Sequence, residues 1–529
     1  MATNSKVQQR NELFKTIWSI ADDLRGSVDG WDFKSYILTT LFYRFISENL
    51  CEYLAEQEDA PGFDYSKLSD EQAEYGRKET VAEKGFFILP SELFSRVLDT
   101  VDKDGMRKAE DGEDLNEILS RVFANIEGSA VGTDSEGDLK GLFTDFDPNS
   151  PKLGNTVIER NKKLVALISK IGAIDFGGDF KDNRIDAFGD AYEYLMNMYA
   201  SNAGKSGGEF FTPQEIGELL ARIVLVGRDE VNKVYDPCCG SGSLLLKFSK
   251  ILGLNKVRKG FFGQEINLTS YNLARINMFL HDIGFDKFDI QLGDTLKDPK
   301  HWDDEPFDAI VSNPPYSIKW EGDDNPLNIN DPRFSPAGVL APKSKADLAF
   351  TMHMLSWLST EGTAAIVEFP GVLYRGGAEG KIRKYLVQNN FVDTVIQLPA
   401  DCFFGTTIAT CIIVLKKSKA SGDILFVDAS NEFKRYDTRN HVEPENIERI
   451  VGAIEAREDV EYFCKRVPND VVVANDANLS VSSYVEKEDT REAIDIKALN
   501  AEIAQIVARE QELRDAIDAI VADLEGGAE

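Results

Sequence analysis

Apolar residues recur along the chain with two different spacings. In residues 1–165 they repeat at intervals of three and four, as in FKSYILTTLFYRFISENLCEYL, a spacing that predicts amphipathic helices. Residues 166–420 instead carry short apolar runs, each followed by a turn and then by a helical pattern. Residues 421–529 are acidic and end in a helical pattern. We therefore expect three parts with these bounds: a helical N-terminal domain, an α/β domain and an acidic C-terminal region.

The middle part contains seven apolar runs. They are KVYDP, GFFGQE, IQLGD, DAIVSNPP, AAIVEFP, TVIQLP and CIIVLKK. Strands that alternate with helices predict a mostly parallel sheet covered by helices on both faces. In such sheets a ligand binds beyond the carboxyl ends of the strands.

The end of the chain has the most regular pattern, a strict alternation of three- and four-residue steps over residues 496–524. Its members are Ile496, Leu499, Ile503, Ile506, Glu510, Leu513, Ile517, Ile520 and Leu524. This pattern, called the C-terminal seam below, is typical of a coiled coil that binds a partner helix. A helix that docks on its own domain is the alternative.

Composition excludes several classes of protein. No apolar run is long enough to cross a membrane and the first residues lack the apolar core of a signal peptide, so we expect a cytoplasmic protein. The six cysteines and four histidines show no metal-ligand spacing, so we expect no metal. The net charge of −31 means that DNA binding would need a local basic patch or a partner that supplies one.

The first strand of the expected sheet ends in a glycine-rich turn. Asp236 closes the strand, and Gly240-Ser241-Gly242-Ser243 leads into a helix. Glycines let a ligand approach the backbone, and the helix start offers free N–H groups. A dinucleotide fingerprint would need a third glycine where Leu245 stands. Taken alone, the turn is equally consistent with a purely structural role.

The next two runs also end in carboxylates. Glu265 closes the second run and could accept both ribose hydroxyls of an adenosine, and Asp294 closes the third and could accept from an adenine amino group. Each could also be a solvated acid at a strand end. Three carboxylates in register with a glycine turn favour a nucleoside site.

The fourth run ends in Asn313-Pro314-Pro315-Tyr316. The prolines stop the strand, because neither can donate to the ladder. A rigid turn would explain the prolines, but the tetrapeptide also lies in line with the three carboxylates.

These motifs resemble those of a known family. DPCCGSG and NPPY are similar to the cofactor and catalytic motifs of amino-group DNA methyltransferases, and GEFFTPQEIGELLARIV, placed ahead of the glycine turn, matches the order of the adenine-N6 subgroup. SKADLAFTMHMLSWL, FPGVLYRGGAEGKIRKYL and LPADCFFGTTIATCIIVLKK resemble the modification subunits of type I restriction–modification systems. The resemblance covers nearly the whole chain. It departs from the family pattern at Cys238 or Cys239 and at Glu209.

The resemblance implies the fold of an S-adenosylmethionine-dependent methyltransferase, with a seven-stranded sheet, and it implies that cofactor. The cofactor-binding residues it implies are Glu209, Phe210, Phe211, Thr212, Pro213, Gln214, Asp236, Gly240, Ser241, Gly242, Ser243, Glu265 and Asp294. Thr212 could alternatively serve as a helix N-cap.

The chemistry of adenine fits the catalytic motif independently. The N6 lone pair is delocalised into the ring, so two acceptors for the N6 hydrogens would make this nitrogen a better nucleophile. The Asn313 side-chain oxygen and the Pro314 carbonyl are the candidates, with Pro315 fixing the direction of that carbonyl. Methyltransferases flip the target base and stack it on aromatic rings. Tyr316 is the first candidate for stacking, and the resemblance adds Phe403 or Phe404, for which core packing is the alternative.

The long loop 317–346 has no periodicity and is the local candidate for DNA contact. Its cations and its tryptophan are Lys319, Trp320, Arg333, Lys343 and Lys345.

No segment has the features of a domain that reads a DNA sequence. We therefore expect a separate specificity subunit that binds the C-terminal seam, and the resemblance implies two such chains per specificity subunit and a restriction subunit in the full complex. Two alternatives remain: a methyltransferase acting on glutamine side chains of protein, and a catalytically degenerate scaffold that binds DNA.

Overall fold

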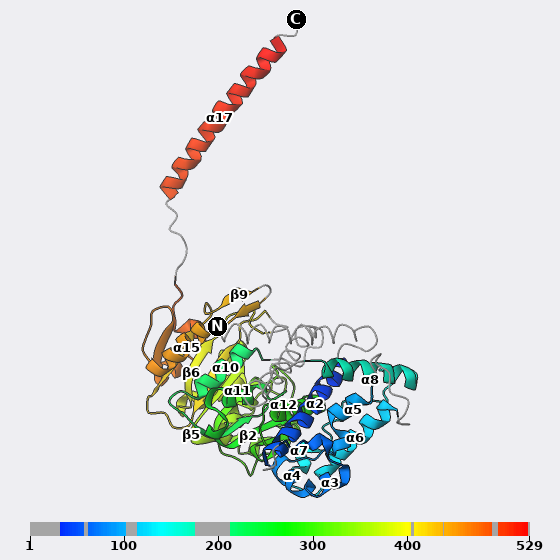
Figure 1. Ribbon diagram of the computed structural model, residues 1–529. Helices are drawn as coiled ribbons and strands as arrows, with labels where there is room; N and C mark the ends of the chain where they lie inside the picture. Colours follow the sequence, from blue (N-terminus) through cyan, green and yellow to red (C-terminus); the bar gives the residue numbers. More distant parts are fainter. Residues whose placement is uncertain are drawn as a thin grey trace. The chain divides into compact units, whose positions relative to one another are not determined.

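The computed structural model describes residues 32–57, 62–101, 114–174, 212–403, 407–436, 439–488 and 496–526. It divides the chain into two units, residues 1–485 and residues 486–529. Figure 1 shows the ribbon coloured along the sequence. In the described part of the chain, no helix is long and apolar enough to cross a membrane.

The N-terminal part is helical, as predicted. Its helices are α2 (Asp32–Gln57), α3 (Asp70–Glu74), α4 (Arg77–Lys84), α5 (Phe94–Asp99), α6 (Leu115–Ser129), α7 (Glu136–Leu139) and α8 (Val157–Gly172). Aromatic rings fill the space between them, and Phe123 stacks on Phe143 with ring centroids 4.4 Å apart. Helix α8 starts with a capping box between Thr156 and Glu159, which explains why it begins there.

A nine-stranded sheet forms the centre of residues 212–485. Its order is β11-β8-β6-β7-β5-β4-β1-β2-β3. The strands are β1 (Val231–Asp236), β2 (Val257–Glu265), β3 (Phe288–Leu292), β4 (Phe307–Ser312), β5 (Leu358–Glu368), β6 (Val392–Gln397), β7 (Cys411–Lys416), β8 (Asp423–Asp428) and β11 (Cys464–Pro468). The pairs that include β7 or β11 are antiparallel, and the other pairs are parallel.

Seven of these strands correspond to the seven apolar runs, which confirms the predicted mostly parallel sheet, although the sheet has nine strands and not the seven that the resemblance implied. Strands β8 and β11 come from the acidic C-terminal region and extend the sheet beyond β6. A separate two-stranded ribbon is formed by β9 (Lys434–Tyr436) and β10 (Arg439–His441).

Helices cover both faces of the sheet (Figure 1). They are α10 (Gln214–Val224), α11 (Ser243–Leu252), α12 (Leu268–Leu280), α13 (Asp347–Trp357), α14 (Gly377–Gln388), α15 (Pro444–Ala456) and α16 (Asn469–Ala474). Successive residues of a strand point to opposite faces. Val234 therefore packs in the core shared with α11 and α12, whereas Tyr235 packs in the core shared with α13.

Helix α12 joins the helical domain to the sheet. The Arg275 guanidinium is buried and donates to the carbonyls of Gly137, Asp138 and Lys140, each at 3.0 Å. These carbonyls lie at the end of α7, where a cation is favourable. On the same helix, the Asn277 side chain donates to the Ser241 carbonyl at 3.0 Å. One helix therefore contacts both the N-terminal domain and the glycine turn.

The second unit contains helix α17 (Ile496–Gly526). All nine positions of the C-terminal seam lie on this helix, and its apolar members are exposed, with Leu524 at 73%.

Candidate active site

The glycine turn between β1 and α11 leaves space beside the backbone. Gly240 and Gly242 have φ angles of 53° and 77°, a left-handed conformation that favours glycine. A Cβ built on Gly240 would meet no described atom within 4 Å, whereas one on Gly242 would lie 2.9 Å from the Met278 methyl. Gly242 thus packs against α12, and Gly240 borders open space that a ligand could fill.

Asp236 is a buried carboxylate at the end of β1. Its Oδ1 accepts the Cys238 N–H and the Ser312 hydroxyl, both at 2.9 Å. Among the described residues, none donates to its Oδ2. Burial raises the pKa of the Asp236 carboxyl to about 7. A buried acceptor with one unused oxygen fits a site that a polar or cationic ligand completes.

Glu265 connects the second strand to the glycine turn. Its Oε2 accepts the Gly240 N–H at 2.9 Å, and its Oε1 accepts the Asn267 N–H at 2.8 Å. Asp294 Oδ1 accepts the N–H of Leu296 at 3.0 Å, which shapes the turn after β3.

The charges of the three strand-end carboxylates all affect the pKa of one thiol. Burial, and then the charges of Asp236, Glu265 and Asp294, raise the pKa of the Cys238 thiol well above its ordinary value. The structure therefore gathers these carboxylates around the glycine turn, as their place in the sequence predicts.

The NPPY segment follows β4, which lies beside β1 in the sheet. The Asn313 side chain is 7% exposed. Its Nδ2 donates to the Thr212 hydroxyl at 2.9 Å, and its Oδ1 accepts the Tyr316 hydroxyl at 2.6 Å. Pro314 is buried, and Pro315 is half-buried. The carboxamide is thus held from both ends.

Tyr316 contacts Asn313 through its hydroxyl, a role that the sequence did not suggest. Burial, and then the nearby Glu368, raise the pKa of this hydroxyl well above its ordinary value, so it remains a donor. Its ring lies beside Phe369, with centroids 6.5 Å apart.

Thr212 is not the N-cap of α10. The helix starts at Gln214 with Pro213 at the cap position, and the Thr212 hydroxyl instead accepts from Asn313. Neither polar atom of the Gln214 side chain has a partner among the described residues, although both are buried. This orphaned amide is a second feature that fits a bound ligand. Glu209, Phe210 and Phe211 lie outside the described residues.

Of the two phenylalanines predicted to stack on the target base, Phe403 lies in the described part of the chain. Phe403 is 3% exposed and packs in the core beside the sheet, which matches the core-packing alternative. Phe404 lies outside the described residues.

The prediction that Arg333 contacts DNA is wrong. Arg333 is 2% exposed, and its guanidinium donates to the carbonyls of Thr295 and Leu296 and to the Asp331 carboxylate, each at 2.8 Å. It anchors the loop 317–346 to the end of β3. Lys343 is exposed but pairs with Asp324 at 3.0 Å, and Trp320 packs on Phe334. Lys319 is exposed.

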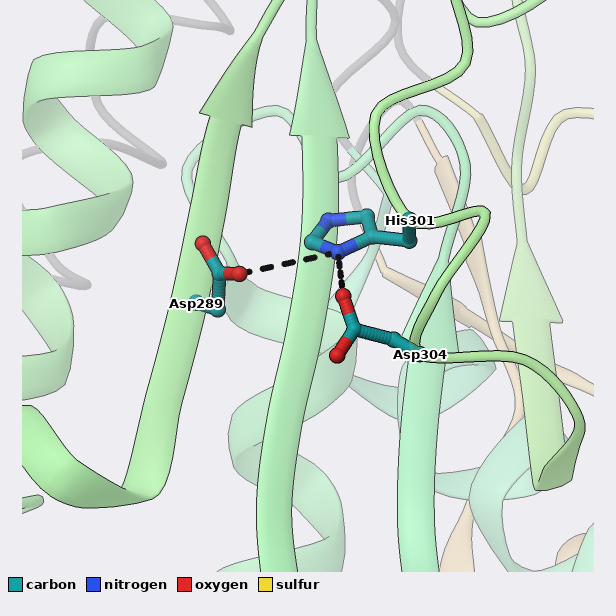
Figure 2. Close-up of side chains that lie close together, drawn as sticks. All are labelled: Asp289, His301 and Asp304. Atoms are coloured by element: carbon teal, nitrogen blue, oxygen red, sulfur yellow. Dashed lines mark hydrogen bonds and ion pairs between the residues drawn. The ribbon is translucent and has the colours of Figure 1, made fainter.

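A histidine–aspartate group lies at the connection between β3 and β4 (Figure 2). The candidate ligand atoms of Asp289, His301 and Asp304 lie within 4.8 Å of one another. The buried His301 ring contacts the Gly263 carbonyl through Nε2 at 3.0 Å and Asp304 Oδ2 through Nδ1 at 2.9 Å. The hydrogen bond from His301 lowers the pKa of the Asp304 carboxyl. Both ring nitrogens therefore have partners within the chain, and the expectation of no metal stays a prediction.

Comparison with known proteins gives two family matches. The N-6 DNA Methylase family matches residues 183–493, and the HsdM N-terminal domain family matches residues 13–171.

Individual relatives agree with these matches. The chain is 49% identical to the type I restriction enzyme MpnII methylase subunit of Mycoplasma pneumoniae, over 98% of this chain and 97% of that protein. It is 29% identical to the MjaVII methylase subunit of Methanocaldococcus jannaschii, over 99% and 85%. The crystal structure of a type I restriction-modification methyltransferase subunit from Streptococcus thermophilus is 36% identical with a TM-score of 0.80, covering 90% of this chain and 100% of that one.

Proposed function

The chain belongs to the N-6 DNA methylase family as a type I modification subunit, and from this membership we propose how it methylates adenine N6 within a specific DNA site. The observation that carries the proposal is the Asn313 carboxamide, which is held between Thr212 and Tyr316 directly after β4, the strand beside β1. An acceptor for an amino group therefore stands beside a candidate nucleoside site.

The residues around the glycine turn would hold S-adenosylmethionine. Bound there, the cofactor supplies a methyl group made electrophilic by its sulfonium. Asp236 offers a buried oxygen and Gln214 a buried amide, neither of which has a partner among the described residues. Glu265 and Asp294 place two more carboxylates at neighbouring strand ends, and Gly240 leaves room for the ligand.

Asn313 and Pro314 would bind the target amino group. Two acceptors for the N6 hydrogens localise the nitrogen lone pair, so the protein activates adenine by position and electrostatics. The Tyr316 hydroxyl fixes which way the Asn313 oxygen faces before the base arrives. Stacking of the flipped base on Tyr316, with Phe404 as a further candidate, is part of the proposal.

We propose that the partner-binding element is the C-terminal seam, within a C-terminal region that starts near residue 421. The names of the type I relatives imply that DNA, a specificity subunit and a restriction subunit are the partners. The C-terminal seam supports contact with the specificity subunit because it exposes eight apolar side chains along one stripe of α17. Two modification chains per specificity subunit and a cytoplasmic location complete the proposal.

Methyl transfer to DNA tests the function directly. We expect labelled methyl groups to enter adenines at one sequence when the chain is co-expressed with its specificity subunit, as mapped by sequencing. Asn313→Ala should lower transfer by about a hundredfold or more while cofactor binding, measured by calorimetry, is retained. Label on protein instead of DNA, or near wild-type transfer by Asn313→Ala, would contradict the proposal.

A further inference from the structure

The residue after the catalytic motif has an unusual backbone. Ser317 directly follows Tyr316 and has a φ of 53°. For a residue other than glycine, this left-handed conformation is unfavourable, so the surroundings must hold it. The direction in which the chain leaves Tyr316 depends on this turn.

Asp347 is the side chain that holds Ser317. Its Oδ1 accepts the Ser317 N–H at 3.0 Å, although the two residues are separated by the whole loop 317–346. The two ends of that loop lie side by side, because the Ala346 N–H donates to the Ile318 carbonyl at 2.9 Å and the Trp320 N–H donates to the Lys343 carbonyl at 3.0 Å. The loop thus returns to deliver a carboxylate to the catalytic turn.

The burial of the Asp347 carboxylate is itself energetically unfavourable. The side chain is 1% exposed, and none of the described residues donates to its Oδ2. A buried carboxylate with an unsatisfied oxygen destabilises the fold. Its neighbour Glu368, also fully buried, accepts the Thr351 hydroxyl at 2.8 Å. Burial, and then the charge of Asp347, raise the pKa of the Glu368 carboxyl well above its ordinary value.

We propose that Asp347 is a positioning residue for methyl transfer, which fixes the Ser317 turn and thereby sets Tyr316 against Asn313. The inference rests on the proposed function and adds a residue outside the NPPY motif. Asp347 acts through the backbone of Ser317, and the Tyr316 hydroxyl passes the constraint to the Asn313 oxygen. A displaced Tyr316 would leave the target amino group poorly aligned without affecting the cofactor residues around the glycine turn.

Steady-state methylation by the complex with the specificity subunit tests this role. Asp347→Ala removes the acceptor, and we expect kcat to fall by about tenfold to a hundredfold, with KM for DNA and for S-adenosylmethionine within about twofold. Asp347→Asn keeps an oxygen that can accept from Ser317, so it should stay within about threefold of wild type. Adding Ser317→Gly to Asp347→Ala should restore part of kcat, because glycine adopts the left-handed turn freely.

Asp393→Ala is the matched control for a purely structural effect. Asp393 lies on β6, away from the motif, and is also buried. Its carboxylate pairs with Arg457 at 3.0 Å. The Asp393→Ala substitution should lower the melting temperature of the protein, and kcat measured well below that temperature should not change. If Asp347→Ala does not fold, Asp347→Glu, which shifts the carboxylate by one methylene, should show the same loss of kcat.

Three results would overturn the role of Asp347. They are an Asp347→Ala enzyme with wild-type kcat, a loss of cofactor binding that accompanies the loss of rate, and no gain from Ser317→Gly. A wild-type complex that methylates no adenine would instead overturn the proposed function, so the two failures are distinguishable.

Discussion

At the scale of single residues, the site depends on side chains whose partners are far away in the sequence. Asn313 is held by Thr212, 101 positions earlier, and Ser317 is held by Asp347, 30 positions later. Spacing along the chain identified the strand-end carboxylates and NPPY. It could not identify these partners, because their proximity is created by the order of strands in the sheet.

Asp236 should make cofactor binding depend on pH. Its pKa of about 7 in the free protein lies well above the value of about 3.9 for an unfolded chain. The carboxyl is therefore protonated below about pH 7, and a cationic cofactor should bind less tightly there. We expect the affinity for S-adenosylmethionine, measured by calorimetry, to fall by about tenfold from pH 8 to pH 6.

The control for this prediction is Asp236→Asn, which should bind the cofactor with a flatter pH profile. The same shift affects folding with the opposite sign. Because the folded protein holds this proton more tightly than the unfolded chain, the contribution of Asp236 to the free energy of unfolding should decrease as pH rises from about 4 to about 7. Equal pH profiles for both proteins would argue against an ionised Asp236 as a cofactor contact.

At the scale of elements, the apolar pattern predicted the strands well and their neighbours poorly. Each of the seven runs forms a strand, because a short apolar run between turns suits a buried strand. The antiparallel placement of β7 between β5 and β6 is not encoded in any local pattern. Arg333 shows the same limit, since a cation in a polar loop favours exposure, and its burial depends in part on distant partners, the carbonyls after β3.

Helix α17 allows a direct test of partner binding. Ile506→Asp with Ile517→Asp places two charges in the C-terminal seam, and we expect the affinity for the specificity subunit to fall by about a hundredfold or more. Co-purification and calorimetry would measure this. Ala508→Asp with Ala522→Asp adds the same charge on the opposite side of the helix and should bind normally. Cofactor binding should be unchanged in both proteins, and normal assembly of the seam variant would exclude the seam as the contact.

At the scale of the whole molecule, charge limits what the chain does alone. A net charge of −31 opposes binding to phosphates, and Arg333 and Lys343 are already paired within the chain. The isolated protein should therefore bind duplex DNA weakly and with a shallow dependence on salt. Fluorescence anisotropy at several salt concentrations should show higher affinity and a steeper slope once the specificity subunit is added. Tight, steeply salt-dependent binding by the isolated chain would contradict this prediction.

The place of β8 in the sheet has a practical consequence for shortened versions of the protein. Strand β6 lies between β7 and β8, and Val395 and Ile396 at its centre are fully buried. A fragment that ends near residue 420 would leave β6 as an open, apolar edge, which is a template for aggregation. A fragment that ends near Val485, at the border between the two units, keeps every strand of the described sheet. Removal of α17 alone would thus test the proposed partner binding without removing a strand from the sheet.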